Sequence, residues 1–195
     1  MDIELLIISC MCYLSGSIPF GIVISKFFNK TDPRKIGSKN IGATNVLRTS
    51  GWKLAGLTLI FDILKGLLPL KFVMFYNEDF IGPSMILIIM GHVFPCWLKF
   101  NGGKGVATFI GILLGYNFYF FLTFIFIWLC SALIFKFSSL AAILAILTNI
   151  IIVLNIDGNY LYFIIISIIV LSKHSTNFIR LLNGKESKII LKKKN

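Results

Sequence analysis

The chain has 195 residues, 57% of them hydrophobic, and a formal net charge of +11. Soluble domains contain about 45–50% apolar residues. The apolar residues here form long uncharged runs, so the sequence predicts an all-α integral membrane protein with one membrane-embedded domain over residues 1–195. The positive charge does not point to nucleic acid, because the basic residues occupy short loops between apolar runs, as in the positive-inside pattern.

Apolar runs of membrane-spanning length recur along the chain. A helix needs about 20 apolar residues to cross about 30 Å of hydrocarbon. Runs of this kind occupy residues 5–25, 54–76, 80–98 and 137–156. A shorter run, 158–172, crosses if the side chain of the following lysine extends to the membrane surface.

The stretch 105–136 is long for one span and short for two. It has no charge before Lys136, and Gly111, Gly115 and Asn117 predict a turn near its middle. We therefore expect two short helices in this stretch. With them, the chain has seven transmembrane helices.

Charge orients these seven spans. The N-terminus lies outside and the C-terminus lies in the cytoplasm, so the acidic turn 77–79 and Asp157 also face outward. Every Lys and Arg then lies on the inner side except Lys65 and Lys71, which fall within the second span. This is the arrangement that the positive-inside rule favours.

Hydrogen-bonding side chains are densest between residues 34 and 48, which combine four basic residues with glycines, hydroxyls and amides. Glycines permit turns whose N–H groups point at an anion. The alternative is a flexible basic loop on lipid headgroups, which would need only lysine and arginine. Upstream, the segment 15–21 contains Pro19 between small residues, which indicates close helix packing or a kink.

Charged residues also occur inside the second apolar run. Asp62 and Lys65 share one helical face, and charges in hydrocarbon usually pair or line a cavity. We expect an ion pair that stabilises the helix packing or supports the site, and direct contact with substrate is the alternative.

A glycine-rich basic loop, Asn101 to Gly105, follows the apolar run 80–98. Its glycines let the backbone approach an anion, and Lys104 is expected to start the next helix beside free N–H groups. The G-x-x-x-x-G-K-[ST] spacing of a nucleotide loop is absent, so ATP binding is not expected. His92, just upstream, is either a packing residue or a site residue.

The last polar segment is 173–184. If it is helical, His174, Asn177 and Arg180 recur every three residues along one face, although a charged tail also produces such spacing by chance. Ser139 lies at the same inner surface, either as a site residue or, with Ser138, as an N-cap pair. The topology brings these segments and the two basic loops to the inner membrane face.

Taken in order from about residue 13 to 184, these segments resemble the bacterial acyl-phosphate:glycerol-3-phosphate acyltransferase family. Lys39 stands where that family often has glycine. The His-x-x-x-x-Asp motif of the other glycerol-phosphate acyltransferase class is absent, because Trp97 and Ile179 stand where it needs Asp. The matching segments are Ser15–Gly21, Arg34–Arg48, Asp62–Gly66, Gly91–Pro95, Gly102–Thr108, and His174 with Asn177.

The resemblance implies a seven-helix enzyme of the bacterial inner membrane with its active site on the cytoplasmic face. It transfers a fatty acyl group from acyl phosphate to the 1-hydroxyl of sn-glycerol 3-phosphate, giving lysophosphatidic acid and phosphate. This is the first step of phospholipid biosynthesis. Catalytic roles are implied for Ser38, Arg48, Lys104 and His174, and substrate binding for Asn40, Thr44, Asn45, Gly102, Gly103, Ser139 and Asn177.

An acyl phosphate is already activated, so direct attack without a covalent acyl-enzyme is expected. The hydroxyl proton passes to the phosphate of the donor, which we favour, or to His174. No metal or other cofactor is expected. The expected partners are the bilayer and, by family analogy, the soluble enzyme that makes acyl phosphate. An organic-phosphate transporter is the alternative, but it usually shows repeated halves with a binding site near the midplane.

Overall fold

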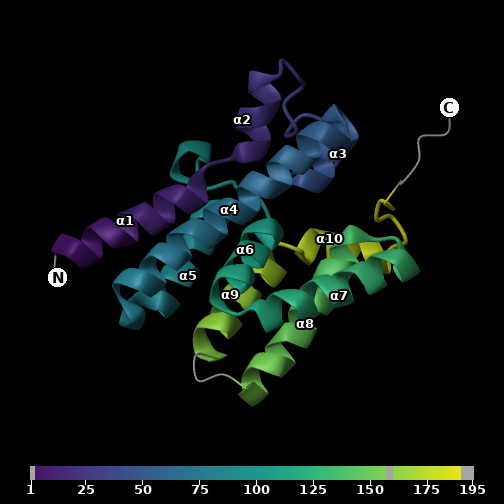
Figure 1. Ribbon diagram of the computed structural model, residues 1–195. Helices are drawn as coiled ribbons and strands as arrows, with labels where there is room; N and C mark the ends of the chain where they lie inside the picture. Colours follow the sequence, from purple (N-terminus) through teal and green to yellow (C-terminus); the bar gives the residue numbers. More distant parts are fainter. Residues whose placement is uncertain (1–2, 157–159, 190–195) are drawn as a thin grey trace. The chain divides into compact units, whose positions relative to one another are not determined.

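The computed structural model describes residues 3–156 and 160–189 (Figure 1). Within these residues the chain is helical and has no β-strand, which confirms the all-α prediction. The chain divides into two compact units, Met1–Phe118 and Tyr119–Asn195, and the single domain predicted over 1–195 stays a prediction. Asp157, predicted to face outward, lies outside the described residues.

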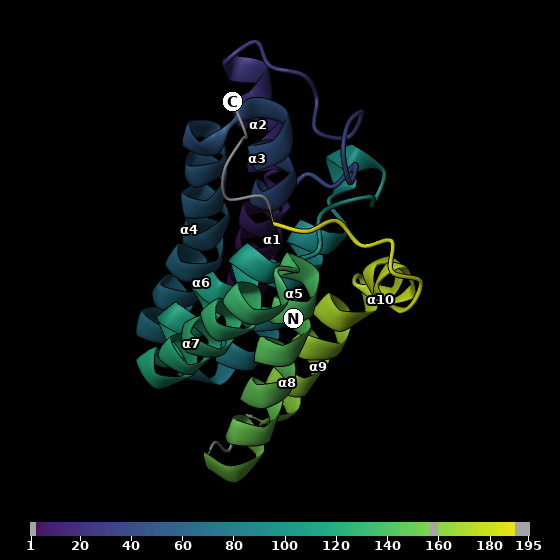
Figure 2. The same cartoon turned by 90° about the vertical axis from the view of Figure 1, so that its right-hand side faces the viewer.

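The first unit is built around one long helix, α4, which packs against every other α-helix of the unit. Figures 1 and 2 show α1 and α5 along one part of α4, and α2 with α3 near its other end. The α-helices of this unit are α1 (Ile3–Ser17), α2 (Phe20–Phe27), α3 (Ala43–Ser50), α4 (Trp52–Tyr76), α5 (Ile81–Val93) and α6 (Val106–Tyr116), with 3-10 turns η1 (Glu78–Phe80) and η2 (Cys96–Leu98).

The predicted kink in the first apolar run is a complete break between α1 and α2. The two helices bend by 53° at Ile18 and Pro19. A broken helix leaves carbonyl groups without their usual donors. Two distant side chains supply donors here: Trp97 Nε1 to the carbonyl of Ser17 at 2.6 Å, and Lys65 Nζ to that of Ile18 at 2.6 Å.

The expected ion pair in the second apolar run is present. Lys65 Nζ lies 2.8 Å from Asp62 Oδ1, and each side chain is only 2% exposed. One ammonium therefore pairs with a buried carboxylate and also satisfies a carbonyl at the helix break. This places the pair in the packing of α4 against the first apolar run.

Glycines bring α1 and α5 into backbone contact. A Cβ at Gly16 would overlap the carbonyl oxygen of Ile88, and a Cβ at Gly91 would overlap that of Tyr13. Each helix therefore places one glycine against a carbonyl of the other. Small residues at such crossings let membrane helices approach closely.

The α4–α6 contact repeats this reciprocal pattern. A Cβ at Gly66 would overlap the carbonyl oxygen of Thr108, and a Cβ at Gly111 would overlap that of Ile63. The glycines in 105–136 that we expected to form a turn thus include one that packs α6 against α4. The turn itself lies at Asn117, whose extended backbone (φ −150°, ψ 119°) separates α6 from the following helix.

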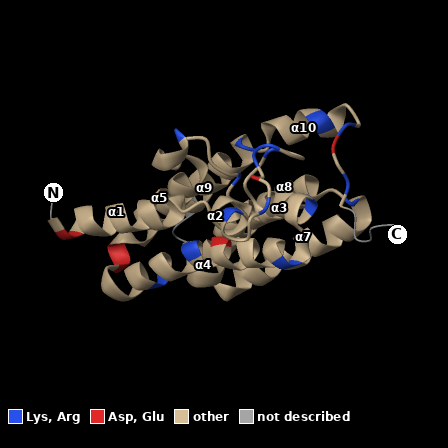
Figure 3. Cartoon of the chain, turned by 90° about the horizontal axis from the view of Figure 1, so that it is seen from above, with Lys and Arg blue, Asp and Glu red and all other residues tan. Residues whose placement is uncertain are grey.

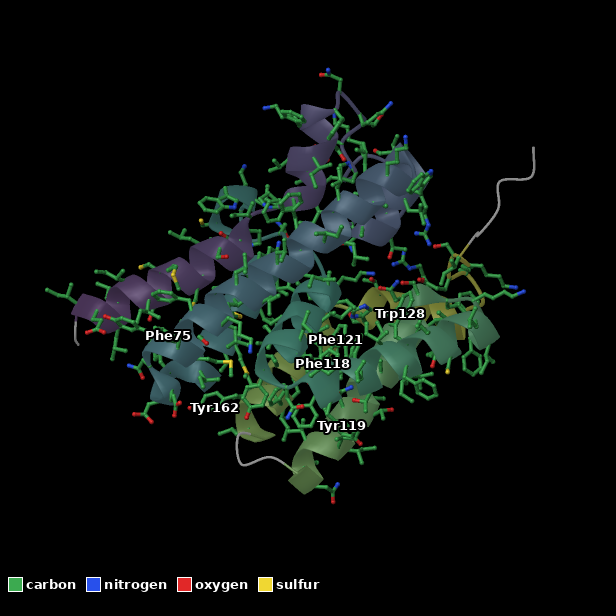
Figure 4. All side chains as sticks on the ribbon, in the orientation of Figure 1. Phe75, Phe118, Tyr119, Phe121, Trp128 and Tyr162 are labelled. Atoms are coloured by element: carbon green, nitrogen blue, oxygen red, sulfur yellow. The ribbon has the colours of Figure 1, made fainter. Side chains whose placement is uncertain are left out.

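The second unit contains α7 (Phe118–Phe135), α8 (Ser138–Ile156), α9 (Tyr160–Ser172) and α10 (Ser175–Leu182). The two helices predicted within 105–136 are therefore confirmed as α6 and α7. Leu122, Phe126, Leu129 and Leu133 follow one another along α7 at helical spacing and are exposed. Figure 4 shows the aromatic side chains of Tyr119, Phe121 and Trp128 on the same helix. An apolar surface of this kind suits contact with lipid.

Among the residues that the structure describes, three helical segments are long and apolar enough to cross a membrane: Glu78–Leu98, Phe118–Phe135 and Ser138–Asn155. The count is five if the bent pairs α1–α2 and α9–α10 each cross once. α4 has 25 residues but contains several charges, and α6 has only 11 residues. The chain is an integral membrane protein, whereas the seven-span count and its orientation stay predictions.

Charge is separated within the first unit. Glu4 lies in the first turn of α1, and Glu78 and Asp79 form the turn after α4. Figure 3 shows acidic residues at the N-terminal end of α1, and basic residues gathered around α2 and α3. The basic loops of this unit therefore lie away from the acidic end of α1.

Candidate active site

The basic segment before α3 folds around the side chain of Asn45. Asn45 Nδ2 donates to the carbonyls of Pro33 at 2.7 Å, Asn40 at 2.9 Å and Ile36 at 3.1 Å, and its Oδ1 accepts from the Ser38 N–H at 2.9 Å. The residue is only 1% exposed. The amide is occupied by its own loop, so Asn45 has a scaffolding role, and contact between Asn45 and substrate stays a prediction.

Two residues of this loop adopt the left-handed backbone region. Gly37 has φ 66° and Lys39 has φ 59°. This region is ordinary for glycine but costs an L-residue roughly 1–2 kcal/mol. The turn forms with lysine at position 39, and the backbone there explains why glycine is the easier residue.

Arg34 and Arg48 have different surroundings although both lie in the same motif. Arg34 Nη2 pairs with Asp32 Oδ2 at 2.6 Å, and its hydrogen bonds hold the pKa of the Asp32 carboxyl below its ordinary value. Arg48 lies on α3, four residues after Thr44, so the two exposed side chains share one helical face. Thr44 and Arg48 thus form the polar face of α3, while Ser38 is half-buried beside it in the loop.

The Asn101–Gly105 loop differs from expectation at its end. We predicted that Lys104 starts the next helix, but α6 begins at Val106, and Gly105 precedes it with φ 90°. Helix entry therefore needs a left-handed residue at position 105, which glycine supplies at little steric cost. Lys104 is half-buried and lies two residues before the helix.

The glycine N–H groups of this loop point toward α5. Gly102 N–H donates to the carbonyl of Val93 at 3.1 Å, and Gly103 N–H donates to that of His92 at 3.1 Å. These bonds satisfy carbonyls at the C-terminal end of α5, which have no partner within the helix. That Gly102 and Gly103 contact substrate stays a prediction, but their N–H groups are already used.

In the second unit, one carboxylate joins three polar side chains. Glu186 Oε1 accepts from Ser139 Oγ at 2.9 Å and from Asn177 Nδ2 at 2.8 Å. Arg180 Nε lies 3.2 Å from Glu186 Oε2, and the Glu186 side chain is 8% exposed. Ser139 therefore lies within α8 and bonds to the tail, so the N-cap alternative is wrong for it.

The sequence reasoning missed Glu186. Nothing in a local pattern links it to Ser139, which is 47 residues away. The one available signal was an isolated acidic residue within a basic tail. The backbone close to Glu186 is held as well, because the N–H of Ile189 donates to the carbonyl of Lys136 at 2.7 Å.

His174 is held by the backbone. Residues Ser175–Leu182 form α10, which contains Asn177 and Arg180, and His174 directly precedes this helix. His174 Nδ1 lies 2.8 Å from the carbonyl oxygen of Val170, and the residue is 3% exposed. A carbonyl oxygen only accepts, so Nδ1 carries the hydrogen, and Nε2 is the acceptor of the neutral ring.

The predicted site residues fall into two sets, one in each unit. Their convergence on a single site stays a prediction. In the described part of the chain, no three His, Cys, Asp or Glu side chains are placed to hold a metal ion. The first unit holds Ser38, Asn40, Thr44, Asn45, Arg48, Gly102, Gly103 and Lys104, and the second holds Ser139, His174 and Asn177.

Comparison with known proteins agrees with this fold and these motifs. The family model for glycerol-3-phosphate acyltransferase matches residues 6–184. A glycerol-3-phosphate acyltransferase of Pelagibacter ubique is 44% identical over 95% of this chain and 97% of its own length. One from Bartonella henselae is 46% identical over 94% of this chain and 90% of its own length.

Two solved structures share the whole fold. Both are crystal structures of PlsY, an integral membrane glycerol 3-phosphate acyltransferase. The glycerol 3-phosphate form has a TM-score of 0.91 and 33% identity, covering 96% of both chains. The lysophosphatidic acid form has a TM-score of 0.88 and 32% identity, covering 95% of both chains.

The matching family model and the PlsY structures identify the class of protein as an integral membrane acyltransferase. The chain belongs to the glycerol-3-phosphate acyltransferase family. Membership places it in phospholipid biosynthesis.

Proposed function

We propose that this protein transfers a fatty acyl group from acyl phosphate to the 1-hydroxyl of sn-glycerol 3-phosphate, releasing lysophosphatidic acid and phosphate. The observation that carries the proposal is the full-length match to the PlsY form with glycerol 3-phosphate. The absence of a His-x-x-x-x-Asp motif at both histidines supports acyl phosphate as the donor.

The proposed chemistry is direct attack. The glycerol 1-oxygen bonds to the acyl carbonyl carbon, the bond from that carbon to the phosphate oxygen breaks, and inorganic phosphate leaves. Both substrates carry phosphate, so the protein must neutralise charge and orient the two reactants. Orientation alone supplies about 7–11 kcal/mol in favourable cases. Lys104, Arg48, Ser38 and Thr44 are the proposed phosphate ligands.

The hydroxyl proton has two possible acceptors, the phosphate of the donor and His174 Nε2. We favour the phosphate, because the sequence motifs place no carboxylate beside His174 that would orient it. The 2.8 Å contact of Nδ1 with the Val170 carbonyl nevertheless leaves Nε2 as the ring's acceptor. Substitution separates the two: His174→Gln that retains most of kcat excludes this histidine as an essential base.

The site is proposed to lie on the cytoplasmic face of the inner membrane in a seven-span arrangement, with the N-terminus outside. The charge separation within the first unit supports this orientation. Its substrates are glycerol 3-phosphate from the cytoplasm and an acyl phosphate supplied by a soluble enzyme. Reporter fusions at Lys136 test the topology, and an external signal there would contradict it.

The deciding assay is phosphate release by the purified full-length protein in detergent, given acyl phosphate and glycerol 3-phosphate. Lys104→Ala and Arg48→Ala should each abolish turnover while leaving Tm close to that of the wild type. Lys30→Ala, a basic and exposed position outside the motif, is the matched control and should retain activity. Near-normal turnover in either site variant would contradict the proposed phosphate ligands, and wild-type inactivity with acyl phosphate would contradict the donor.

A further inference from the structure

His92 lies beneath the Asn101–Gly105 loop. It is near the C-terminal end of α5 and is 4% exposed. Its carbonyl accepts the N–H of Gly103 at 3.1 Å, while the carbonyl of Val93 accepts the N–H of Gly102. The loop therefore runs back along the end of α5 and rests on His92.

A Cβ added to either glycine would also project toward the end of α5 and the residues after it. A Cβ at Gly103 would overlap His92 Nε2, and its next neighbours would be two carbons of the same ring. A Cβ at Gly102 would overlap the His92 carbonyl oxygen and lie 2.5 Å from Pro95 Cδ. Steric exclusion by α5 and the residues after it is thus sufficient to require glycine at both positions. At Gly103 the N–H donates to the His92 carbonyl, and the space that a Cβ would need is occupied by the His92 ring.

Thr108 fixes the imidazole from the other end of the loop. Its Oγ1 lies 3.0 Å from His92 Nδ1, and the residue is fully buried in the first turn of α6. A hydroxyl can donate or accept, so the contact forms with either neutral tautomer. The residues before and after the loop are therefore tied together through one ring.

We propose that His92 is a positioning residue for the Asn101–Gly105 loop. It acts through Gly103 and Thr108 and sets the loop on α5 so that the Lys104 ammonium, rather than the Gly102 and Gly103 N–H groups, meets a substrate phosphate. The proposal rests on the phosphate-binding role proposed above for Lys104. The phosphate belongs to glycerol 3-phosphate or to the acyl donor, and separate titrations of the two distinguish them.

A double-mutant cycle tests the link between Gly103 and His92. Gly103→Ala should lower kcat/KM about 100-fold, as expected for displacement of a site group by about 1 Å. His92→Ala should lower kcat/KM about 10-fold, and adding Gly103→Ala to it should cost no more than about 3-fold further, because the obstructing ring is gone. Gly56→Ala, where a Cβ meets nothing within 4 Å, is the matched control and should retain activity.

An equal loss of kcat/KM on Gly103→Ala in the wild type and in His92→Ala would overturn the proposal. The glycine would then be needed for close approach of its backbone to phosphate, independently of His92. Coupling seen in Tm without coupling in kcat/KM would also overturn it, because His92 would then be only structural. If the wild type releases no phosphate from acyl phosphate, the donor proposal fails. The cycle is then read from calorimetric binding of glycerol 3-phosphate, where the same coupling is expected, and additive losses or equal binding by all variants would overturn the proposal.

Thr108 provides a second test that does not depend on an added methyl group. Thr108→Ser keeps the hydroxyl and should stay within about 2-fold of wild type, whereas the similarly shaped Thr108→Val removes the hydrogen bond. Loss of one such bond to a buried ring corresponds to about 10-fold. We expect it as a higher KM for the substrate whose phosphate Lys104 holds, with a smaller change in kcat. Unchanged KM for both substrates in Thr108→Val would contradict the role of this contact.

Discussion

Replacing Lys65 by methionine should destabilise the first unit strongly. The ammonium of Lys65 lies 2.8 Å from Asp62 Oδ1 and donates to the carbonyl of Ile18 at 2.6 Å. Lys65→Met keeps an unbranched side chain but leaves a carboxylate that is 2% exposed without its cation. It also leaves a carbonyl at the helix break without this donor.

The two losses set the magnitude. Removing one partner of a buried ion pair costs about 3–5 kcal/mol. A buried acceptor that loses its donor costs about 1–3 kcal/mol. The free energy of unfolding should therefore fall by at least about 4 kcal/mol in Lys65→Met. For a chain of this size, that corresponds to a Tm lower by about 8–16 °C.

The informative comparison is with Asp62→Leu combined with Lys65→Met. The double variant has no unpaired charge, so only the carbonyl loss of about 1–3 kcal/mol should remain. Thermal unfolding of both proteins in the same detergent measures the difference, with Leu59→Ala on an exposed position of α4 as control. A single variant as stable as the double variant, or more stable, would refute the idea that Lys65 neutralises a buried carboxylate.

Variants at three further positions test the loops. Glu186→Ala should lower phosphate release at least about 10-fold, because Ser139 and Asn177 lose their common acceptor; Glu186→Gln retains an acceptor oxygen and should lie between it and wild type, and full activity of Glu186→Ala would contradict the role of the carboxylate. Lys39→Gly should match wild type within about 1 kcal/mol in unfolding experiments, whereas Lys39→Val should be clearly less stable, since a β-branched residue disfavours φ 59°. Equal melting temperatures for the two would show that the turn tolerates any side chain. Asn45→Leu should lower both Tm and activity, because the Asn45 amide holds the loop through four hydrogen bonds. A normal Tm with lost turnover would instead assign Asn45 to substrate contact.

Local pattern was sufficient to predict the features that depend on neighbouring residues. Length and hydropathy predicted a helical membrane protein, Pro19 marked the break in the first run, and Asn117 marked the boundary between two helices. The spacing of Asp62 and Lys65 predicted an ion pair. In each case the physical cause lies within a few residues of the feature.

The features that were missed depend on distant contacts. The donors at the helix break, Lys65 and Trp97, come from residues 47 and 80 positions away from the carbonyls they serve. Asn45 carried the same local signal as a ligand, and only the folded loop shows that its amide is already occupied. The helix after the Asn101–Gly105 loop was predicted to begin at Lys104, two residues too early. It begins at Val106, because Gly105 first adopts the left-handed backbone region.

The reciprocal glycine contacts of the first unit have a mechanical consequence. Sliding α1 along α5 by one residue, a 1.5 Å rise with about 100° of rotation, would replace Gly16 at its carbonyl contact by a residue with a Cβ. The α4–α6 pair is restricted in the same way at Gly66 and Gly111. The close glycine–carbonyl contacts therefore hold each helix pair in one axial register. Motion that admits substrate or releases product in this unit is therefore expected in the loops, with the helices serving as a fixed frame.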